Sequence, residues 1–193
     1  MNLSFKSPLF SRELNTSLHL LTNVQAENAV QASIAIKTLF PNIDEKIIEK
    51  GLSKASLPAR FEIKNESKKN PLIIYDGAHT AESIRNTLKS LQEIFPNKNK
   101  HALFACSSDK DIEKIAVLFK NIFSRVSLTS PGLTRAWAKE RAFHAFQNKS
   151  ISFVFENDFK KAVLESLNFA KKDNALLLVI GSFYLVADVK KII

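Results

Sequence analysis

From residue 58 onward, short apolar runs alternate with amphipathic stretches, and this pattern constrains the fold more than any other feature. It predicts strands at 60–64, 72–75, 101–106, 125–129, 151–155 and 175–180, and helices at about 81–95, 109–123, 135–147, 158–171 and from about 183. Such alternation is typical of a mostly parallel sheet with helices on both faces. The link between the first two strands is short, which favours an antiparallel pair. We therefore predict an α/β, three-layer Rossmann-like domain with a six-stranded, mixed, mostly parallel sheet.

The first 57 residues follow a different pattern. Short strands are indicated within the first 22 residues, because Leu18 and Leu20 alternate with polar neighbours. A helix is predicted over 23–40, ended by Pro41, and a second over about 44–53. These elements are too few to close a core of their own. We expect this segment to expose apolar faces.

Composition and charge narrow the class of protein. The chain has 193 residues, of which 45% are hydrophobic and 24% charged, a globular mixture unlike that of a disordered chain. The net charge is +9, of which +1 falls on residues 1–58 and +8 on 59–193. A basic segment can attract nucleotides, other polyanions or nucleic acid. The lysines are scattered along helix faces, which favours a solvated surface over a nucleic-acid patch.

Glycine is scarce, and its spacing excludes two phosphate-binding motifs. The four glycines are Gly51, Gly77, Gly132 and Gly181. A P-loop needs two glycines five positions apart, and a dinucleotide fingerprint needs three within six residues. Neither motif is present, so phosphate binding by this chain would need another device.

The remaining exclusions concern cysteine, metals and membranes. The single cysteine, Cys106, lies in an apolar run and is expected to be a buried small hydrophobe; one cysteine can form no disulfide framework, as in a reducing cytosol. No set of His, Cys and acidic residues has metal-ligand spacing, and His101 shows no partner pattern. The longest uncharged run, 174–187, is too short to span a bilayer, and no signal peptide begins the chain. We expect a cytoplasmic protein with no membrane partner.

Polar residues follow three of the predicted strands and are candidates for a site, because ligands bind at the carboxyl ends of parallel strands. The segments are Asp76-Gly-Ala-His79, Ser107-Ser-Asp-Lys-Asp111 and Gly181-Ser-Phe-Tyr. A helix beginning after the first and after the third segment could offer free N–H groups to an anion. Each segment also has a purely structural interpretation. The first would be a helix-capping aspartate with a hydrogen-bonded histidine, the second a capping box from Ser108 to the aspartate at 111, and the third a plain strand–helix turn.

Taken together, five segments resemble one family. They are Asn28-Ala, Pro58-Ala-Arg60-Phe-Glu, Asp76-Gly-Ala-His79, Asp109-Lys-Asp111 and Gly181-Ser-Phe-Tyr-Leu-Val. In this order they resemble the C-terminal part of the folylpolyglutamate synthase / dihydrofolate synthase family, of the Mur ligase superfamily. The resemblance implies that residues 1–57 are the end of a P-loop ATPase domain, the Mur ligase central domain. It implies that 58–193 form the glutamate ligase domain.

The resemblance also implies a reaction and its ligands. The family phosphorylates a folate or dihydropteroate carboxylate with ATP and magnesium, and L-glutamate then attacks the acyl phosphate. The family motifs place Asn28, Arg60 and Asp76 against ATP. His79, Lys110, Asp111 and Ser182 are expected to face glutamate. No residue is assigned a catalytic role.

This sequence departs from the family pattern in three ways. Ala59 replaces a glycine and Thr80 replaces an asparagine, which leaves the contacting side chains in place. The third departure is larger, because the P-loop, the magnesium ligands, a carbamylated lysine and most of the folate pocket would lie upstream. We therefore expect this chain to be inactive alone, as the product of either a split or a truncated gene, with a separate N-terminal ATPase half as one possible partner. The alternative is a non-catalytic remnant that binds a nucleotide or a partner; a basic nucleic-acid-binding module is disfavoured.

Overall fold

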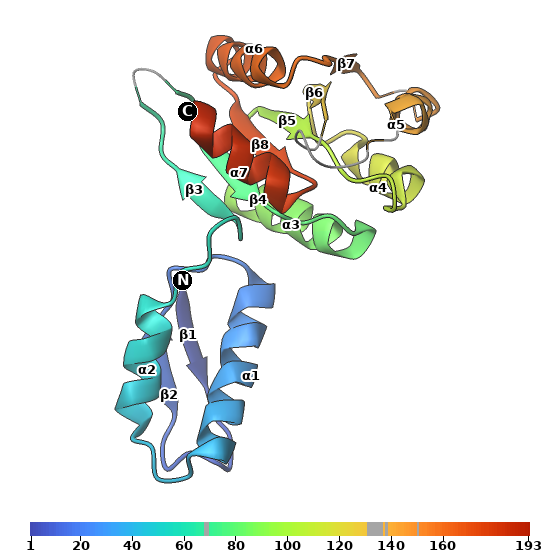
Figure 1. Ribbon diagram of the computed structural model, residues 1–193. Helices are drawn as coiled ribbons and strands as arrows, with labels where there is room; N and C mark the ends of the chain where they lie inside the picture. Colours follow the sequence, from blue (N-terminus) through green and yellow to red (C-terminus); the bar gives the residue numbers. More distant parts are fainter. Residues whose placement is uncertain (68–69, 131–136, 138, 150) are drawn as a thin grey trace. The chain divides into compact units, whose positions relative to one another are not determined.

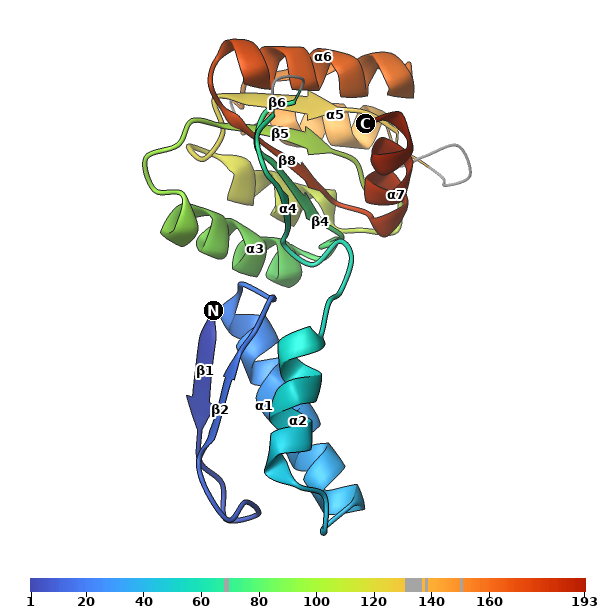
Figure 2. The same cartoon turned by 90° about the vertical axis from the view of Figure 1, so that its left-hand side faces the viewer.

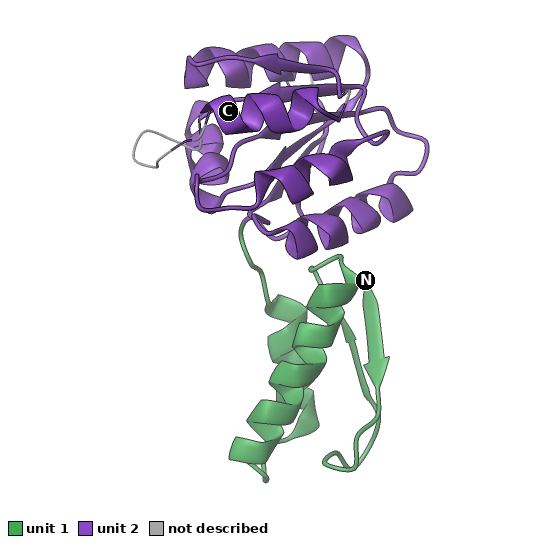
Figure 3. Ribbon diagram, turned by 90° about the vertical axis from the view of Figure 1, so that its right-hand side faces the viewer, with its two compact units in different colours: residues 1–58 green, residues 59–193 purple. Residues whose placement is uncertain are grey.

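The computed structural model describes residues 1–67, 70–130, 137, 139–149 and 151–193. The chain divides into two compact units, Met1–Pro58 and Ala59–Ile193, each of which is described by itself (Figure 3). Gly132 and the first residues of the helix predicted over 135–147 lie outside the described residues, apart from Trp137.

A six-stranded sheet forms the centre of unit 2, in the order β3-β4-β8-β5-β6-β7 (Figure 1). The strands are β3 (Glu62–Lys64), β4 (Ile73–Asp76), β5 (Lys100–Phe104), β6 (Arg125–Leu128), β7 (Phe153–Phe155) and β8 (Leu176–Ile180). β3 pairs antiparallel with β4, and the other pairs are parallel. The predicted mixed, mostly parallel sheet is confirmed.

Helices cover both faces of this sheet (Figures 1 and 2). On one face, α6 (Phe159–Lys172) and α7 (Phe183–Ile192) contact the central strands. On the other lie α3 (Ala81–Ile94), α4 (Ile112–Phe119) and α5 (Lys139–Gln147). Every residue of β4, β5 and β8 is buried, as expected for parallel strands covered on two sides.

The two faces of the sheet bury separate apolar layers. Leu177 and Val179 of β8 pack with Val163 and Leu167 of α6 on one face. On the opposite face, the rings of Phe104, Phe119 and Phe146 pack with centroids 5.1–5.7 Å apart. Each aromatic comes from a different element, so the three rings join β5 to α4 and α5.

Side-chain caps fix the helix starts, and one start differs from the prediction. The Thr80 hydroxyl accepts a hydrogen bond from the Ser83 N–H at 3.2 Å and begins α3 at Ala81. The predicted start of α4 at about 109, with a capping box from Ser108, is wrong. Asp111 is itself the N-cap, since its carboxylate accepts from the Lys114 N–H at 3.2 Å, and the helix begins at the next residue.

Unit 1 consists of a two-stranded hairpin and two helices. β1 (Asn2–Phe5) pairs antiparallel with β2 (Leu14–Ser17), and α1 (Asn23–Leu39) and α2 (Glu45–Lys54) follow. The second strand ends just before Leu18, earlier than the alternation of Leu18 and Leu20 indicated. The four elements bury one small cluster of Phe10, Leu14 and Ile48, so they close more of a core than predicted.

Much apolar surface in unit 1 remains exposed. Leu39, Phe40 and Ile47 are 71%, 58% and 60% exposed. An apolar groove of about 250 Å³ runs between α1 and α2. The predicted exposed apolar faces are therefore present. Among the helices of the described residues, none combines the length and the apolar character that a membrane crossing requires.

Candidate functional site

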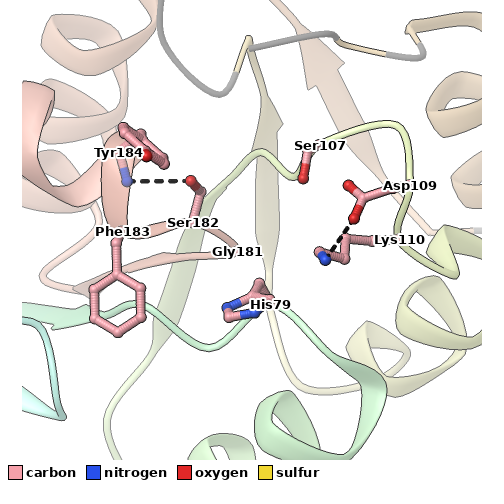
Figure 4. A pocket seen from close by; sticks show the side chains of 8 residues that line it. All are labelled: His79, Ser107, Asp109, Lys110, Gly181, Ser182, Phe183 and Tyr184. Carbon is pink, nitrogen blue, oxygen red and sulfur yellow. Dashed lines mark hydrogen bonds and ion pairs between the residues drawn. The ribbon is translucent and has the colours of Figure 1, made fainter.

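The ends of three neighbouring strands form a pocket in unit 2. In the register of the sheet, Asp76 of β4 and Phe104 of β5 both lie level with Ile180 of β8 between them. The loops that follow these strands therefore leave the sheet side by side. They enclose a pocket of about 220 Å³ lined by His79, Ser107, Asp109, Lys110, Gly181, Ser182, Phe183 and Tyr184 (Figure 4). The expectation that these three loops meet is confirmed.

The loop after β8 strongly favours glycine at its first position. Gly181 has a φ of +116°, a conformation that residues with a side chain rarely adopt. A Cβ there would also overlap the Ala105 carbonyl and the Phe104 ring. The next residue, Ser182, caps α7 by accepting from the Tyr184 N–H at 3.1 Å. The same hydroxyl can still donate its own proton to an acceptor in the pocket.

His79 contributes an imidazole to the pocket from the loop after β4. Its Nδ1 lies 2.9 Å from the Gly77 carbonyl oxygen. Because a carbonyl can only accept, Nδ1 carries the proton, and in the neutral ring Nε2 has a free lone pair. The Thr80 cap that follows fixes the backbone of this loop. The replacement of the family's asparagine by threonine therefore leaves a working helix cap.

Of the three charged residues after β5, two line the pocket and one does not. Lys110 Nζ lies 2.6 Å from Asp109 Oδ2, and this hydrogen bond lowers the pKa of Asp109 to about 2. Asp111 is held by Lys114, whose ammonium lies 2.9 Å from the carboxylate, and it does not line the pocket. Its predicted place against the substrate is not supported by this geometry, because capping α4 directs its carboxylate to the helix.

Arg60 sits on a turn that the Asp76 carboxylate holds. The two residues flanking Arg60, Ala59 and Phe61, have φ values of 57° and 49° in the left-handed region. Asp76 Oδ2 accepts from the Phe61 N–H at 3.0 Å, while Oδ1 accepts from the Ala78 N–H at 2.8 Å. The left-handed φ at Ala59 explains why the family pattern has glycine there.

Asp76 is therefore engaged by the protein's own backbone. The residue is only 6% exposed, and burial raises the pKa of its carboxyl group against the opposing effect of these hydrogen bonds. Its predicted contact with ATP stays a prediction. The role visible in the structure is to hold the turn that carries Arg60.

The Arg60 guanidinium lies over the Phe183 ring, with Cζ 4.7 Å from the ring centroid. Within the described part of the chain, it makes no hydrogen bond or ion pair. Asn28 belongs to unit 1, where it lies on the exposed side of α1. Sequence reasoning missed Phe183 and Tyr184 as pocket residues, although both stand in the Gly181-Ser-Phe-Tyr segment that it singled out.

Two further titratable groups lie away from the pocket interior. Cys106 is buried, and burial raises the pKa of its thiol to about 12, which leaves no thiolate at neutral pH. His101, at the start of β5, is buried with Nε2 3.2 Å from Asp173 Oδ2, a partner that the sequence pattern did not indicate. The residues described here contain no group of three His, Cys, Asp or Glu side chains that could hold a metal ion.

Comparison with known families identifies the family to which this fold belongs. Residues 59–183 match the family described as "Mur ligase, glutamate ligase domain". The chain belongs to the Mur ligase family. The predicted resemblance is thus confirmed, and the matched range contains every residue that lines the pocket except Tyr184.

The Mur ligase relatives are mostly folate enzymes. The dihydrofolate synthase/folylpolyglutamate synthase of Bacillus subtilis is 24% identical over 93% of this chain and 41% of its own length. The enzyme of that name from Escherichia coli is 29% identical over 88% of this chain and 38% of its own. The chain thus spans about two fifths of the length of these Mur ligase relatives.

Solved structures show the same Mur ligase fold. The folylpolyglutamate synthase of Mycobacterium tuberculosis, complexed with ADP and AMPPCP, matches with a TM-score of 0.80 and 20% identity, over 92% of this chain and 42% of that one. The bifunctional folylpolyglutamate synthase/dihydrofolate synthase of Yersinia pestis, complexed with AMPPNP and a Mn ion, matches with a TM-score of 0.70 and 25% identity, over 94% and 42%.

Proposed function

We propose that this chain is the C-terminal part of an ATP-dependent ligase that adds L-glutamate to folate or dihydropteroate through an acyl phosphate. In this proposal unit 2 is the glutamate ligase domain, and unit 1 is the end of the ATPase domain. The observation that carries it is the convergence of three strand-end loops on a pocket with Lys110, His79 and Ser182, within the range that matches the glutamate ligase family.

The pocket suits a small dicarboxylate with an amine. Within the described residues Lys110 is paired only with its neighbour Asp109, so its ammonium can turn to a substrate carboxylate at the cost of one solvent-exposed ion pair, which stabilises the fold little. The Ser182 hydroxyl can donate to the same or the other carboxylate. The His79 Nε2 lone pair can accept a proton from the amine that attacks. Asp109 stays ionised and keeps the site from being uniformly positive.

Arg60 is the residue that best fits a nucleotide phosphate. Its guanidinium lies over an aromatic ring and makes no hydrogen bond or ion pair with a carboxylate in the described part of the chain, so its N–H groups are available for bidentate contact with phosphate oxygens. ATP supplies the phosphoryl group that activates the folate carboxylate, and magnesium accompanies it. We assign the magnesium ligands to an N-terminal half. Asn28 would contact the adenine edge, and Asp76 would act by fixing the turn beneath Arg60.

In this reaction the main contributions of the chain are to position the substrates and to neutralise their charge. Phosphate is a good leaving group, so the attack of the glutamate amine on the acyl phosphate needs alignment of the amine and neutralisation of the developing charge. Lys110 in the pocket and Arg60 over the Phe183 ring provide two cations for the two anionic ligands. The basic excess of +8 in residues 59–193 would also draw both ligands towards this unit.

An N-terminal ATPase half, either a separate protein or an upstream part of the same one, is what this proposal requires. Such a half would carry the sequence Gly-x-x-Gly-Lys-Gly-Ser. The apolar groove between α1 and α2 and the exposed Leu39, Phe40 and Ile47 are available for it to cover. A surface of this kind marks a protein–protein contact more often than a free face.

The test is to mix this chain with the P-loop half from the same genome and measure ADP release. We expect release that depends on both glutamate and the folate substrate, and none from this chain alone. Arg60→Ala should abolish it. Arg85→Ala, at an exposed arginine on α3 outside the pocket, is the matched control and should leave it unchanged.

Two results would contradict the proposal. ATP turnover by the chain alone would refute the dependence on a second half. An inert mixture of two stably folded halves would favour the alternative, a non-catalytic remnant that binds a nucleotide or a partner.

A further inference from the structure

Phe183 occupies a position that its apolar character alone does not explain. It is the first residue of α7, placed there by the Ser182 cap, and 37% of it is exposed beside a polar pocket (Figure 4). A surface aromatic of this kind could be replaced by a polar residue at little cost in burial. Its neighbours therefore decide what it does.

Three groups surround the Phe183 ring. The Arg60 Cζ lies 4.7 Å from its centroid, and the His79 ring meets it edge-on with centroids 6.3 Å apart. Gly77 lies against it so closely that a Cβ at that position would come within 2.7 Å of the ring atom Cγ. The ring therefore fills the space between the loop of Arg60 and the loop of His79.

The helix behind the ring is tied to the same turn. Near the other end of α7, Lys190 Nζ lies 2.6 Å from Glu62 Oε1. The Glu62 carboxylate in turn accepts from the Ala59 N–H at 2.9 Å. α7 thus contacts the Arg60 turn at two points, one of which is the aromatic ring. A rigid element held in this way can set where the guanidinium lies.

We propose that Phe183 is a positioning residue that holds Arg60 and His79 in one fixed arrangement. If the proposed function holds, the Phe183 ring links Arg60, which binds the nucleotide phosphate, to the pocket that binds glutamate. In the described residues the Arg60 side chain makes no hydrogen bond or ion pair, and without the ring it would sample many rotamers, whose conformational entropy is worth about 2 kcal/mol. Stacking on the ring restricts it while leaving the N–H edge of the guanidinium open to phosphate.

The placement can be tested on the isolated chain by NMR. Protons over the face of an aromatic ring are shifted upfield by its ring current. We expect the Arg60 Nε–H signal, assigned by its loss in Arg60→Lys, to move downfield in Phe183→Leu and to keep its position in Phe183→Tyr. Gly77→Ala, which displaces the ring from the other side, should also move it.

The chain offers a matched control at a second arginine. Arg125 Cζ lies 3.5 Å from the centroid of Phe169 on α6. Phe169→Leu should move the Arg125 signal and leave the Arg60 signal in place, and Phe183→Leu should do the reverse. Trp137 fluorescence during urea unfolding reports whether each variant remains folded. An Arg60 signal that is unchanged in Phe183→Leu would overturn the proposal.

The functional link is tested in the reconstituted ligase. Loss of a partly desolvated cation–π contact should lower kcat/KM for glutamate about tenfold in Phe183→Leu. Phe183→Tyr should keep kcat/KM near the wild-type value, and Phe169→Leu should leave it unchanged. A shifted Arg60 signal with unchanged kinetics would overturn the link between the subsites. If wild-type halves show no glutamate-dependent ADP release, the proposed function fails, while the NMR comparison still decides the placement.

Discussion

Replacing Gly181 by alanine should destabilise unit 2 strongly, for two reasons that add. The φ of +116° lies in a region that costs a residue with a side chain about 1–3 kcal/mol. The new methyl group would overlap the Ala105 carbonyl and the Phe104 ring, which is fully buried and has no space to move. Overpacking of this kind costs a further ~1–3 kcal/mol.

The net effect follows from these costs and one opposing contribution. Alanine lowers the conformational entropy of the unfolded chain, which returns about 0.4–1 kcal/mol. We therefore expect Gly181→Ala to lower the free energy of unfolding by about 3 kcal/mol. For a unit of this size the melting temperature should fall by roughly 10 °C.

The assay uses the single tryptophan. Trp137 and both tyrosines lie in unit 2, so tryptophan fluorescence during urea unfolding reports that unit alone. Gly51→Ala is the control, because Gly51 lies inside α2 and no atom lies within 4 Å of the place that the new methyl group would take. It should stabilise unit 1 by about 1 kcal/mol in far-ultraviolet circular dichroism and leave the fluorescence midpoint unchanged. An unaltered fluorescence midpoint in Gly181→Ala would refute the reasoning.

Three further predictions concern other positions. Asp76→Asn should lower the free energy of unfolding by about 1–3 kcal/mol in the same assay, because an amide has one acceptor for two backbone N–H groups, and an equal midpoint would contradict it. Burial lowers the pKa of His101, so the unfolded chain binds its proton more readily; stability should fall as pH drops below about 6.5, and urea midpoints at pH 7.5 and 5.5 should differ less in His101→Gln. Ile47→Lys should reduce self-association of the isolated chain in sedimentation without lowering its stability, since Ile47 is exposed; stronger association would count against the apolar contact surface.

The sheet could be predicted because its signal is local. The run Leu-Leu-Leu-Val-Ile of β8 has no alternation, and such a run indicates a strand buried on both faces. The order of strands and the helices between them then fix the three strand ends that carry polar residues. The start of α4 could not be placed in the same way, because Ser108 and Asp111 both have side chains that cap helices. Only the backbone geometry decides between them.

The Arg60 turn depends on contacts that no local pattern contains. Ala59 and Phe61 are poor candidates for positive φ, and no propensity would place them there. The backbone of Phe61 is held by Asp76, 15 residues further along the chain, and that of Ala59 by Glu62. Phe183 was missed for a similar reason, since its contacts with Gly77 and Arg60 arise only when β4 and β8 lie side by side.

The place of β8 in the sheet has a consequence for biosynthesis. β4 and β5 are near each other in sequence, yet each pairs with β8, which comes much later in the sequence than either of them. Until residues 176–180 have left the ribosome, the two halves of the sheet have no partner along their apolar edges. Pairing strands that are far apart in sequence is slow, and the unpaired strand edges can aggregate before β8 joins them. The nascent chain should therefore depend on chaperones until β8 has been synthesised, because the middle of the sheet is missing until then.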